Sequence, residues 1–123
     1  MLISHKVATL LVIISLMFAF ALVASAWNPN NPAHIEEYIH YVAGKEGVSV
    51  SKVLSIARCE SGFKMGAIHS TDKEYSVGVF QINLKAHPYI TLEQALNPFF
   101  NISWAIDRMR EGLWNWWTCA RLT

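Results

Sequence analysis

The chain has 123 residues, and ten Lys and Arg against nine Asp and Glu give it a formal net charge of +1. This length suits one small folded domain. Because the chain is nearly neutral and has no basic run, we do not expect it to bind nucleic acid or to capture an acidic polymer mainly by charge.

Residues 1–26 have the pattern of an export signal. Lys6 gives a short positive region, residues 7–23 are almost entirely apolar, and Ala24–Ala26 matches the small-residue cleavage pattern. An uncleaved membrane anchor is the alternative, because the apolar stretch is long for a signal peptide and short for a bilayer span. In both cases we expect the domain to be secreted or to lie in the periplasm or cell wall. The membrane would be contacted only through this N-terminal segment, and only if the segment is not cleaved.

Residues 27–32 form a short spacer rich in Asn and Pro, and residues 33–123 form the domain. The first helix is predicted to begin with Asn31 as its cap and Pro32 at its first position, an arrangement that suits both residue types. Gly44 or Gly47 ends it. Its apolar stripe consists of Ile35, Tyr38, Ile39 and Val42.

A second helix is predicted to be capped by Ser49 and to run to about Glu60, with Gly62 as its stop. Its apolar positions are Val53, Ile56 and Ala57, and the same spacing continues to Glu60. The pattern therefore places a carboxyl group on a buried stripe, at the negative end of the helix dipole. Both surroundings favour the protonated carboxyl and predict a raised pKa. An acid that stays protonated near neutral pH can donate a proton to a glycosidic oxygen.

Cys59 and Cys119 are the two cysteines of the chain. In an exported protein an even count predicts a disulfide, with two buried free thiols as the alternative. Closing a loop of about 60 residues would stabilise the fold by roughly 4 kcal/mol in the chain-entropy model. The bond would also tie the end of the chain to the residue beside Glu60. The histidines lack the spacing of zinc ligands, so we expect neither a metal nor another cofactor.

The middle of the chain has weaker signals. Residues 63–77 are predicted to be a loop with a short hairpin, and residues 79–82 a single helical turn after Gly78. Thr91 has capping-box spacing to Gln94 and opens a short third helix. Asn97 and Pro98 then cap and start a longer helix that ends near Gly112. The apolar stripe of this helix is Phe99, Ile102, Ile106, Met109 and Leu113.

Four segments resemble the lysozyme-like superfamily, and in particular its small exported lytic transglycosylases of the SLT type. Residues Cys59–Phe63 are similar to the Glu-Ser motif that carries the catalytic acid. Residues Gly78–Asn83 resemble the Gly-x-x-Gln-Ile segments that line the sugar cleft. Residues Asn97–Ile102 and Trp114–Cys119 resemble an Asp/Asn-Pro-x-x-Asn-Ile helix start and a C-terminal Trp-x-x-Trp-Ser/Thr-Cys motif. The resemblance covers about residues 50 to 119.

The resemblance implies a mainly helical α+β fold with a short loop or hairpin beside the cleft. It implies a monomer that cleaves the β-1,4 bond between N-acetylmuramic acid and N-acetylglucosamine in peptidoglycan. Glu60 would be the general acid and then the base, and Ser61 would orient it or meet the substrate. The other substrate-binding residues would be Ser76, Gly78, Phe80, Gln81, Asn83 and Trp117.

Ser76 is the main departure from this pattern, because lysozymes of the animal-egg type carry an Asp at that place. Without it, the 2-acetamido group of the substrate becomes the natural nucleophile, and Glu60 then produces a 1,6-anhydro sugar, which is lytic transglycosylase chemistry. Asp72 and Glu74 remain candidates for a second carboxylate, which would make the enzyme a hydrolase. A binding module with weak or lost catalysis is the third alternative.

A second departure is the missing Ala-Tyr-Asn-Ala-Gly element of larger transglycosylases. Tyr75 and Tyr89 are the candidates for its aromatic hydroxyl. The C-terminal tryptophans either stack on sugar rings or close an apolar cluster around the disulfide. Among them, we assign only Trp117 to the cleft.

Overall fold

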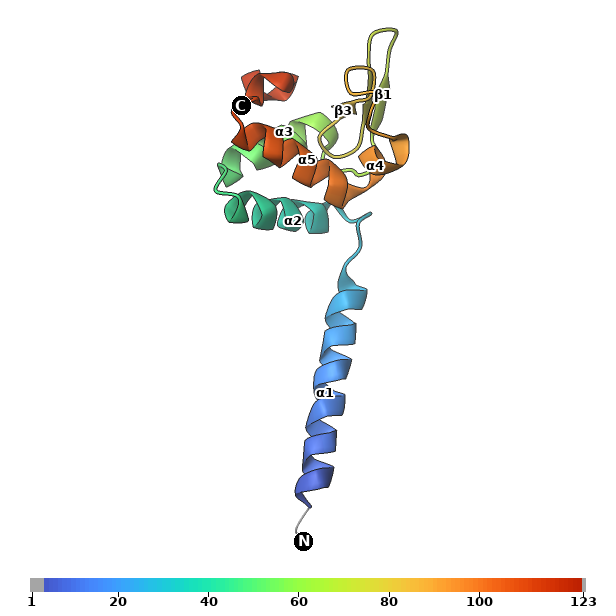
Figure 1. Ribbon diagram of the computed structural model, residues 1–123, viewed down its shortest axis with the longest axis vertical. Helices are drawn as coiled ribbons and strands as arrows, with labels where there is room; N and C mark the ends of the chain where they lie inside the picture. The colour runs from blue at the N-terminus through green and yellow to red at the C-terminus, as the bar shows by residue number, and fades with distance from the viewer. Residues whose placement is uncertain (1–3, 123) are drawn as a thin grey trace.

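The computed structural model describes residues 4–122, without the side chains of residues 16–25. Helix α1 (His5–Ala26) extends away from the other helices and the strands (Figure 1). Among the described residues, no helix has both the length and the apolar character needed to cross a bilayer. The export signal predicted for residues 1–26 stays a prediction.

Three helices form the body of the domain: α2 (Pro32–Lys45), α3 (Val50–Ser61) and α5 (Pro98–Arg110). Helix α2 packs against both α3 and α5 (Figure 1). Ser49 precedes α3 as predicted, but its side chain makes no capping hydrogen bond. The caps predicted at Asn31 and Asn97 are confirmed, because the Asn31 side chain accepts from the Ala33 N–H and the Asn97 side chain accepts from the Phe99 N–H. Each cap satisfies a backbone donor that the first helical turn leaves without a partner.

The core is formed by residues of these helices together with Trp117 and Cys119 of the C-terminal segment. The prediction that Phe99 and Leu113 lie in the core is wrong, since Phe99 is 46% exposed and Leu113 is only partly buried. Phe99 lies in the first turn of α5, beyond the edge of the core, and packs edge-on against Tyr38 with ring centroids 5.0 Å apart. The buried stripe of α5 is instead made by Ile102, Ala105, Ile106 and Met109.

A small antiparallel sheet adjoins the helices, in the order β1 (Ile68–Ser70), β2 (Tyr75–Val77) and β3 (Ile82–Asn83). The β1–β2 pair is the predicted hairpin. The helical turn predicted for residues 79–82 is wrong, because Ile82 belongs to β3. Gly78 and Gln81 have φ values of 82° and 49°, and this left-handed backbone forms a strand-to-strand turn in place of a helical one.

Helix α4 (Leu92–Leu96) begins with the predicted capping box, in which Thr91 and Gln94 exchange side-chain to backbone hydrogen bonds. Two short 3₁₀ helices, η1 (Trp114–Trp116) and η2 (Thr118–Arg121), end the described chain beside α3. The predicted disulfide between Cys59 and Cys119 is confirmed. It fastens η2 to the end of α3, which explains how such a short C-terminal segment keeps its place.

Candidate active site

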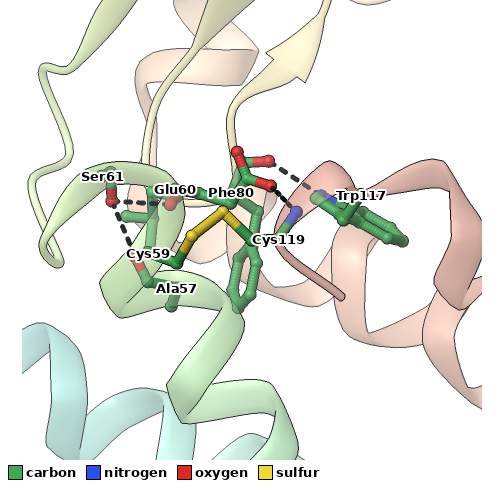
Figure 2. The surroundings of a disulfide bond; sticks show 8 residues. Ala57, Cys59, Glu60, Ser61, Phe80, Trp117 and Cys119 are labelled. Carbon is green, nitrogen blue, oxygen red and sulfur yellow. Dashed lines mark hydrogen bonds between the residues drawn. A yellow bond between two sulfur atoms is a disulfide. The ribbon is translucent and has the colours of Figure 1, made fainter. Parts of the chain in front are cut away.

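Glu60 lies in the last turn of α3, one residue after Cys59. Gly62 ends the helix with φ 62°, a left-handed conformation that glycine adopts without steric cost. The disulfide brings the backbone of Cys119 to the carboxylate, and the Cys119 N–H donates to Glu60 Oε1 at 3.3 Å. Figure 2 shows the carboxylate of Glu60 beside the disulfide and Trp117. Two residues 59 positions apart in the sequence therefore meet at one carboxyl group.

The pKa of Glu60 is raised above its ordinary value, as the sequence predicted. Partial burial is the main cause, because a desolvated carboxyl favours its neutral form. The hydrogen bond from the Cys119 N–H stabilises the charged form and opposes this effect. The negative charge of Glu74 raises the pKa further. The net result is a carboxyl group suited to donating a proton.

A polar pocket of about 380 Å³ opens in front of Glu60. Its walls come from the end of α3, the β1–β2 hairpin, β3 and the C-terminal segment. Of the residues predicted from sequence, the pocket brings together Glu60, Glu74, Ser76, Gln81, Asn83 and Trp117. The other lining residues are His69, Trp116 and Thr118.

A second pocket of about 290 Å³ adjoins the first and is mainly aromatic. The two pockets share Gln81, Asn83, Trp116 and Trp117, so we describe them as the acidic and the aromatic compartments of one cleft. The aromatic compartment is completed by Ile82, Ala86, His87 and Trp104. A cleft with two compartments suits an extended ligand made of repeating units.

His87 packs against two tryptophans of this compartment. Its ring centroid lies 4.9 Å from that of Trp104 and 5.2 Å from that of Trp116. Burial lowers the pKa of His87, and the positive charge of Arg108 lowers it further. A neutral imidazole therefore continues the apolar wall. Sequence reasoning missed His87, because no spacing pattern links it to the other cleft residues.

Glu74 is held in the acidic compartment from two sides. Ser76 Oγ donates to Glu74 Oε2 at 3.2 Å, and His69 Nε2 lies 3.1 Å from Glu74 Oε1. His69 and Ser76 are direct partners across the β1–β2 pair, so the hairpin itself orients the carboxylate. Asp72 lies in the loop between these strands, is exposed, and does not line either compartment.

Ser61, Gly78 and Phe80 lie behind the cleft and line neither compartment. Ser61 Oγ donates to the Val79 carbonyl at 2.6 Å, which joins the end of α3 to the turn between β2 and β3 (Figure 2). Phe80 is fully buried in the core. Gly78 has no room for a Cβ atom, because one would overlap the Asn101 amide and the Ala95 carbonyl.

Asn101 of α5 is a fully buried polar residue that supports the same turn. Its Nδ2 donates to the carbonyls of Val77 and Ala95 at 3.0 and 2.8 Å, and its Oδ1 accepts from the Phe80 N–H at 2.8 Å. Three backbone groups beside the cleft thus depend on one side chain. Sequence reasoning gave Asn101 no role, although the Asn-Pro-x-x-Asn motif was the available signal.

The tryptophans divide into a structural and an accessible group. Trp117 is only 4% exposed, and its Nε1 donates to the Phe80 carbonyl at 2.9 Å. Trp116 is 47% exposed and lines both compartments. Trp116 is therefore the tryptophan with the larger surface for a ligand. Tyr75 and Tyr89 line neither compartment.

The helical body, the small sheet and a single acid at the end of α3 define a lysozyme-like protein. A family model described as the transglycosylase SLT domain matches residues 37–117. The chain therefore belongs to the transglycosylase SLT domain family. No curated protein and no solved structure matches the chain.

Proposed function

We propose that this protein cleaves peptidoglycan glycan strands as a lytic transglycosylase, with Glu60 as its acid and base. Family membership supports a transglycosylase-type activity in general. The observation that carries the finer proposal is the carboxyl group of Glu60, which has a raised pKa and lines a polar cleft. A protonated carboxyl group at that place can donate a proton to the oxygen of a glycosidic bond.

The reaction then proceeds in two steps. Glu60 gives its proton to the glycosidic oxygen of the bond between N-acetylmuramic acid and N-acetylglucosamine, while the 2-acetamido oxygen of the muramic acid attacks C1. In the second step the 6-hydroxyl of the same sugar attacks C1 and displaces the acetamido oxygen. Glu60 takes the hydroxyl proton, which restores the acid. No water is consumed, so the product is a 1,6-anhydro sugar.

The place of Ser76 supports substrate assistance. Its hydroxyl donates to Glu74, so this residue supplies neither a charge nor a nucleophile to the cleft. The acetamido group of the substrate brings its own nucleophile and needs no second protein carboxylate. Ser61 and Asn101 form hydrogen bonds with the backbone of the turn from Gly78 to Gln81. These bonds would keep the cleft wall at a fixed position relative to Glu60.

Hydrolysis is the second candidate, and the geometry of Glu74 favours it. This carboxylate lines the same compartment as Glu60, and both of its oxygens are engaged by the hairpin. A carboxylate held in this way could activate water or stabilise positive charge at C1. Asp72 has no comparable support, because it lies outside both compartments. Hydrolysis would leave a reducing end in place of the anhydro sugar.

We also propose that the domain acts outside the cytoplasm as a monomer without a cofactor. The disulfide supports this location, because such bonds persist in oxidising compartments. Peptidoglycan lies there as well. The N-terminal segment 1–26 would direct export and would be the only part to contact the membrane.

The direct test is release of soluble fragments from purified peptidoglycan by the oxidised protein and its Glu60→Gln variant. Gln can still accept the hydrogen bond from the Cys119 N–H, so the variant should fold while losing its proton donor. We expect a loss of at least about 100-fold in rate, the usual scale for general acid catalysis. Glu37→Gln, a change at an exposed position of α2 that lines neither compartment, is the matched control. Full activity of the Glu60 variant would contradict the proposal.

A further inference from the structure

The tip of the β1–β2 hairpin is held by a lysine from outside the hairpin. Lys85 lies two residues after β3, and its Nζ donates to the carbonyls of Thr71 and Asp72 at 2.9 and 2.8 Å. Hydrogen bonds from a charged ammonium group are stronger than those between neutral groups. In the sheet, β3 pairs with β2 and not with β1. Lys85 therefore adds a connection from the segment after β3 to the loop between β1 and β2.

The hairpin tip has no share in the hydrophobic core. Residues 68–73 are all exposed, and the loop between β1 and β2 extends beyond the helices (Figure 1). Burial of apolar side chains is the main force that fixes a segment of a folded chain, and here that force is missing. A segment of this kind opens easily unless its hydrogen bonds hold it. The position of the tip therefore depends on its polar contacts.

The backbone contacts of Thr71 connect Lys85 to Glu74. The Thr71 N–H donates to the Glu74 carbonyl at 2.9 Å, and the Glu74 N–H donates to Thr71 Oγ1 at 3.1 Å. Lys85 thus holds the carbonyl of the residue that fixes the Glu74 backbone. The Lys85 N–H itself donates to Asn83 Oδ1 at 3.1 Å, and the same oxygen accepts from the Tyr75 N–H at 3.2 Å. The lysine is therefore attached to the sheet at its own backbone as well.

We propose that Lys85 is a positioning residue, which holds the hairpin tip so that the Glu74 carboxylate stays in the acidic compartment with Glu60. The inference rests on the proposed function, in which Glu60 is the acid. Ser76 Oγ donates to the Glu74 carboxylate at 3.2 Å, and His69 lies 3.1 Å from it. These contacts orient the carboxylate, whereas Lys85 ties the loop that leads to Glu74 to the segment after β3.

The charge of Glu74 links the position of the hairpin to the chemistry of the site. Burial raises the pKa of Glu60, the Cys119 N–H opposes this effect, and the charge of Glu74 raises the pKa further. The titratable side chains that line the acidic compartment are Glu60, His69 and Glu74. If Glu74 leaves the compartment, the pKa of Glu60 falls. Loss of the positive charge of Lys85 alone would raise that pKa, because a nearby cation favours a carboxylate. The two effects therefore differ in sign.

Lys85→Met separates these effects, because it keeps a long side chain but removes both the charge and the donors. The measurement is an NMR titration of the Glu60 carboxyl carbon in the free protein. Lys73→Met is the matched control, since Lys73 lies in the same tip and its ammonium has no hydrogen bond within the described part of the chain. Lys85→Arg can still donate to both carbonyls and serves as the rescue variant. His69→Gln, which can still donate to Glu74, repeats the comparison without the imidazole charge.

We expect Lys85→Met to lower the pKa of Glu60, in the same direction as Glu74→Gln, and to add no shift to a protein that already carries Glu74→Gln. Lys85→Arg should restore the parent value, and Lys73→Met should not lower it. The Thr71 amide should exchange with solvent at least about 10-fold faster in Lys85→Met, because the tip opens more often. An unchanged or raised pKa of Glu60 in Lys85→Met would overturn the inference, even if the amide exchanges faster.

This outcome is separable from that of the proposed function. The titration is measured without substrate, whereas cleavage is measured with the wild-type protein on peptidoglycan. A lowered pKa of Glu60 in Lys85→Met, with no cleavage by the wild type, would reject the catalytic proposal and leave the positioning role of Lys85 intact. Cleavage that depends on Glu60, together with an unchanged pKa in Lys85→Met, would reject the positioning role alone.

Discussion

Cys119 contacts Glu60 through its backbone while its side chain is bonded to Cys59, the residue immediately before Glu60. The disulfide therefore attaches the C-terminal segment to α3 and also places the Cys119 N–H beside the carboxyl group of Glu60. The Cys119 N–H stabilises the charged carboxylate and moderates the effect of burial on its pKa. Changes at this bond should alter stability and activity together.

Removal of the disulfide by Cys59→Ser with Cys119→Ser should lower the free energy of unfolding by about 4 kcal/mol in the chain-entropy model. The loop that it closes spans 60 residues, which makes its effect on the unfolded chain large. Urea unfolding of both proteins measures the difference. The double variant should unfold at a lower midpoint with a similar slope, and an unchanged midpoint would show that η2 holds its place without the bond.

Glu74→Gln should shift the pH dependence of kcat/KM. Wild-type activity should fall as pH rises through the raised pKa of Glu60, because the acid must be protonated in the free enzyme. The charge of Glu74 contributes to that raised pKa, so removing it lowers the pKa of Glu60. The high-pH limb of the profile should then move to lower pH.

The control for this profile is Asp72→Asn, which removes a charge from the same hairpin outside the cleft and should leave the limb in place. The same Glu74 variant also separates the two candidate reactions. A transglycosylase should keep its maximal rate within about 10-fold, whereas a hydrolase that needs a second carboxylate should lose at least about 100-fold.

Gly78→Ala should destabilise the domain by more than about 2 kcal/mol. The new methyl group would meet the Asn101 amide and the Ala95 carbonyl, and φ 82° is unfavourable for any residue with a Cβ atom. Thermal unfolding measures the loss. Gly66→Ala is the matched control, because no atom lies within 4 Å of the added methyl group and it should change stability little.

Trp116→Ala should weaken glycan binding and leave stability nearly unchanged. Trp116 is exposed and lines both compartments, so its ring is the largest accessible apolar surface of the cleft. We expect KM to rise by about 10-fold, consistent with the loss of one aromatic contact to a ligand. Tyr41→Ala removes an exposed ring from α2, outside the cleft. An equal effect of the two changes would reject a binding role for Trp116.

Much of the helical fold could be predicted because its signals are local. Asn31, Asn97 and Thr91 each act within one turn of their own helix, so spacing in the sequence is enough to find them. The position of Glu60 on a buried stripe also follows from helical periodicity alone. The disulfide was predictable because the chain offers only one pairing of its two cysteines.

The parts of the site that were missed depend on long-range geometry. Gln81 adopts a left-handed backbone that is uncommon outside glycine, so the turn after Gly78 could not be recognised from residue types. Glu74 and Asp72 could both be named from the sequence as carboxylates, but only the pairing of His69 with Ser76, which no local pattern reveals, decides that Glu74 is the one that lines the cleft. Trp117 directly follows η1, which holds Trp114 and Trp116, and periodicity does not tell the buried ring of Trp117 from the exposed ring of Trp116.

The most direct test of the central claim is the mass of the sugar fragments that the oxidised protein releases from purified peptidoglycan. We predict muropeptides lighter by one water than the hydrolytic products, which is the signature of a 1,6-anhydro end, and their absence with Glu60→Gln. Products that carry a reducing end would contradict transglycosylation and make Glu74 the second carboxylate of a hydrolase.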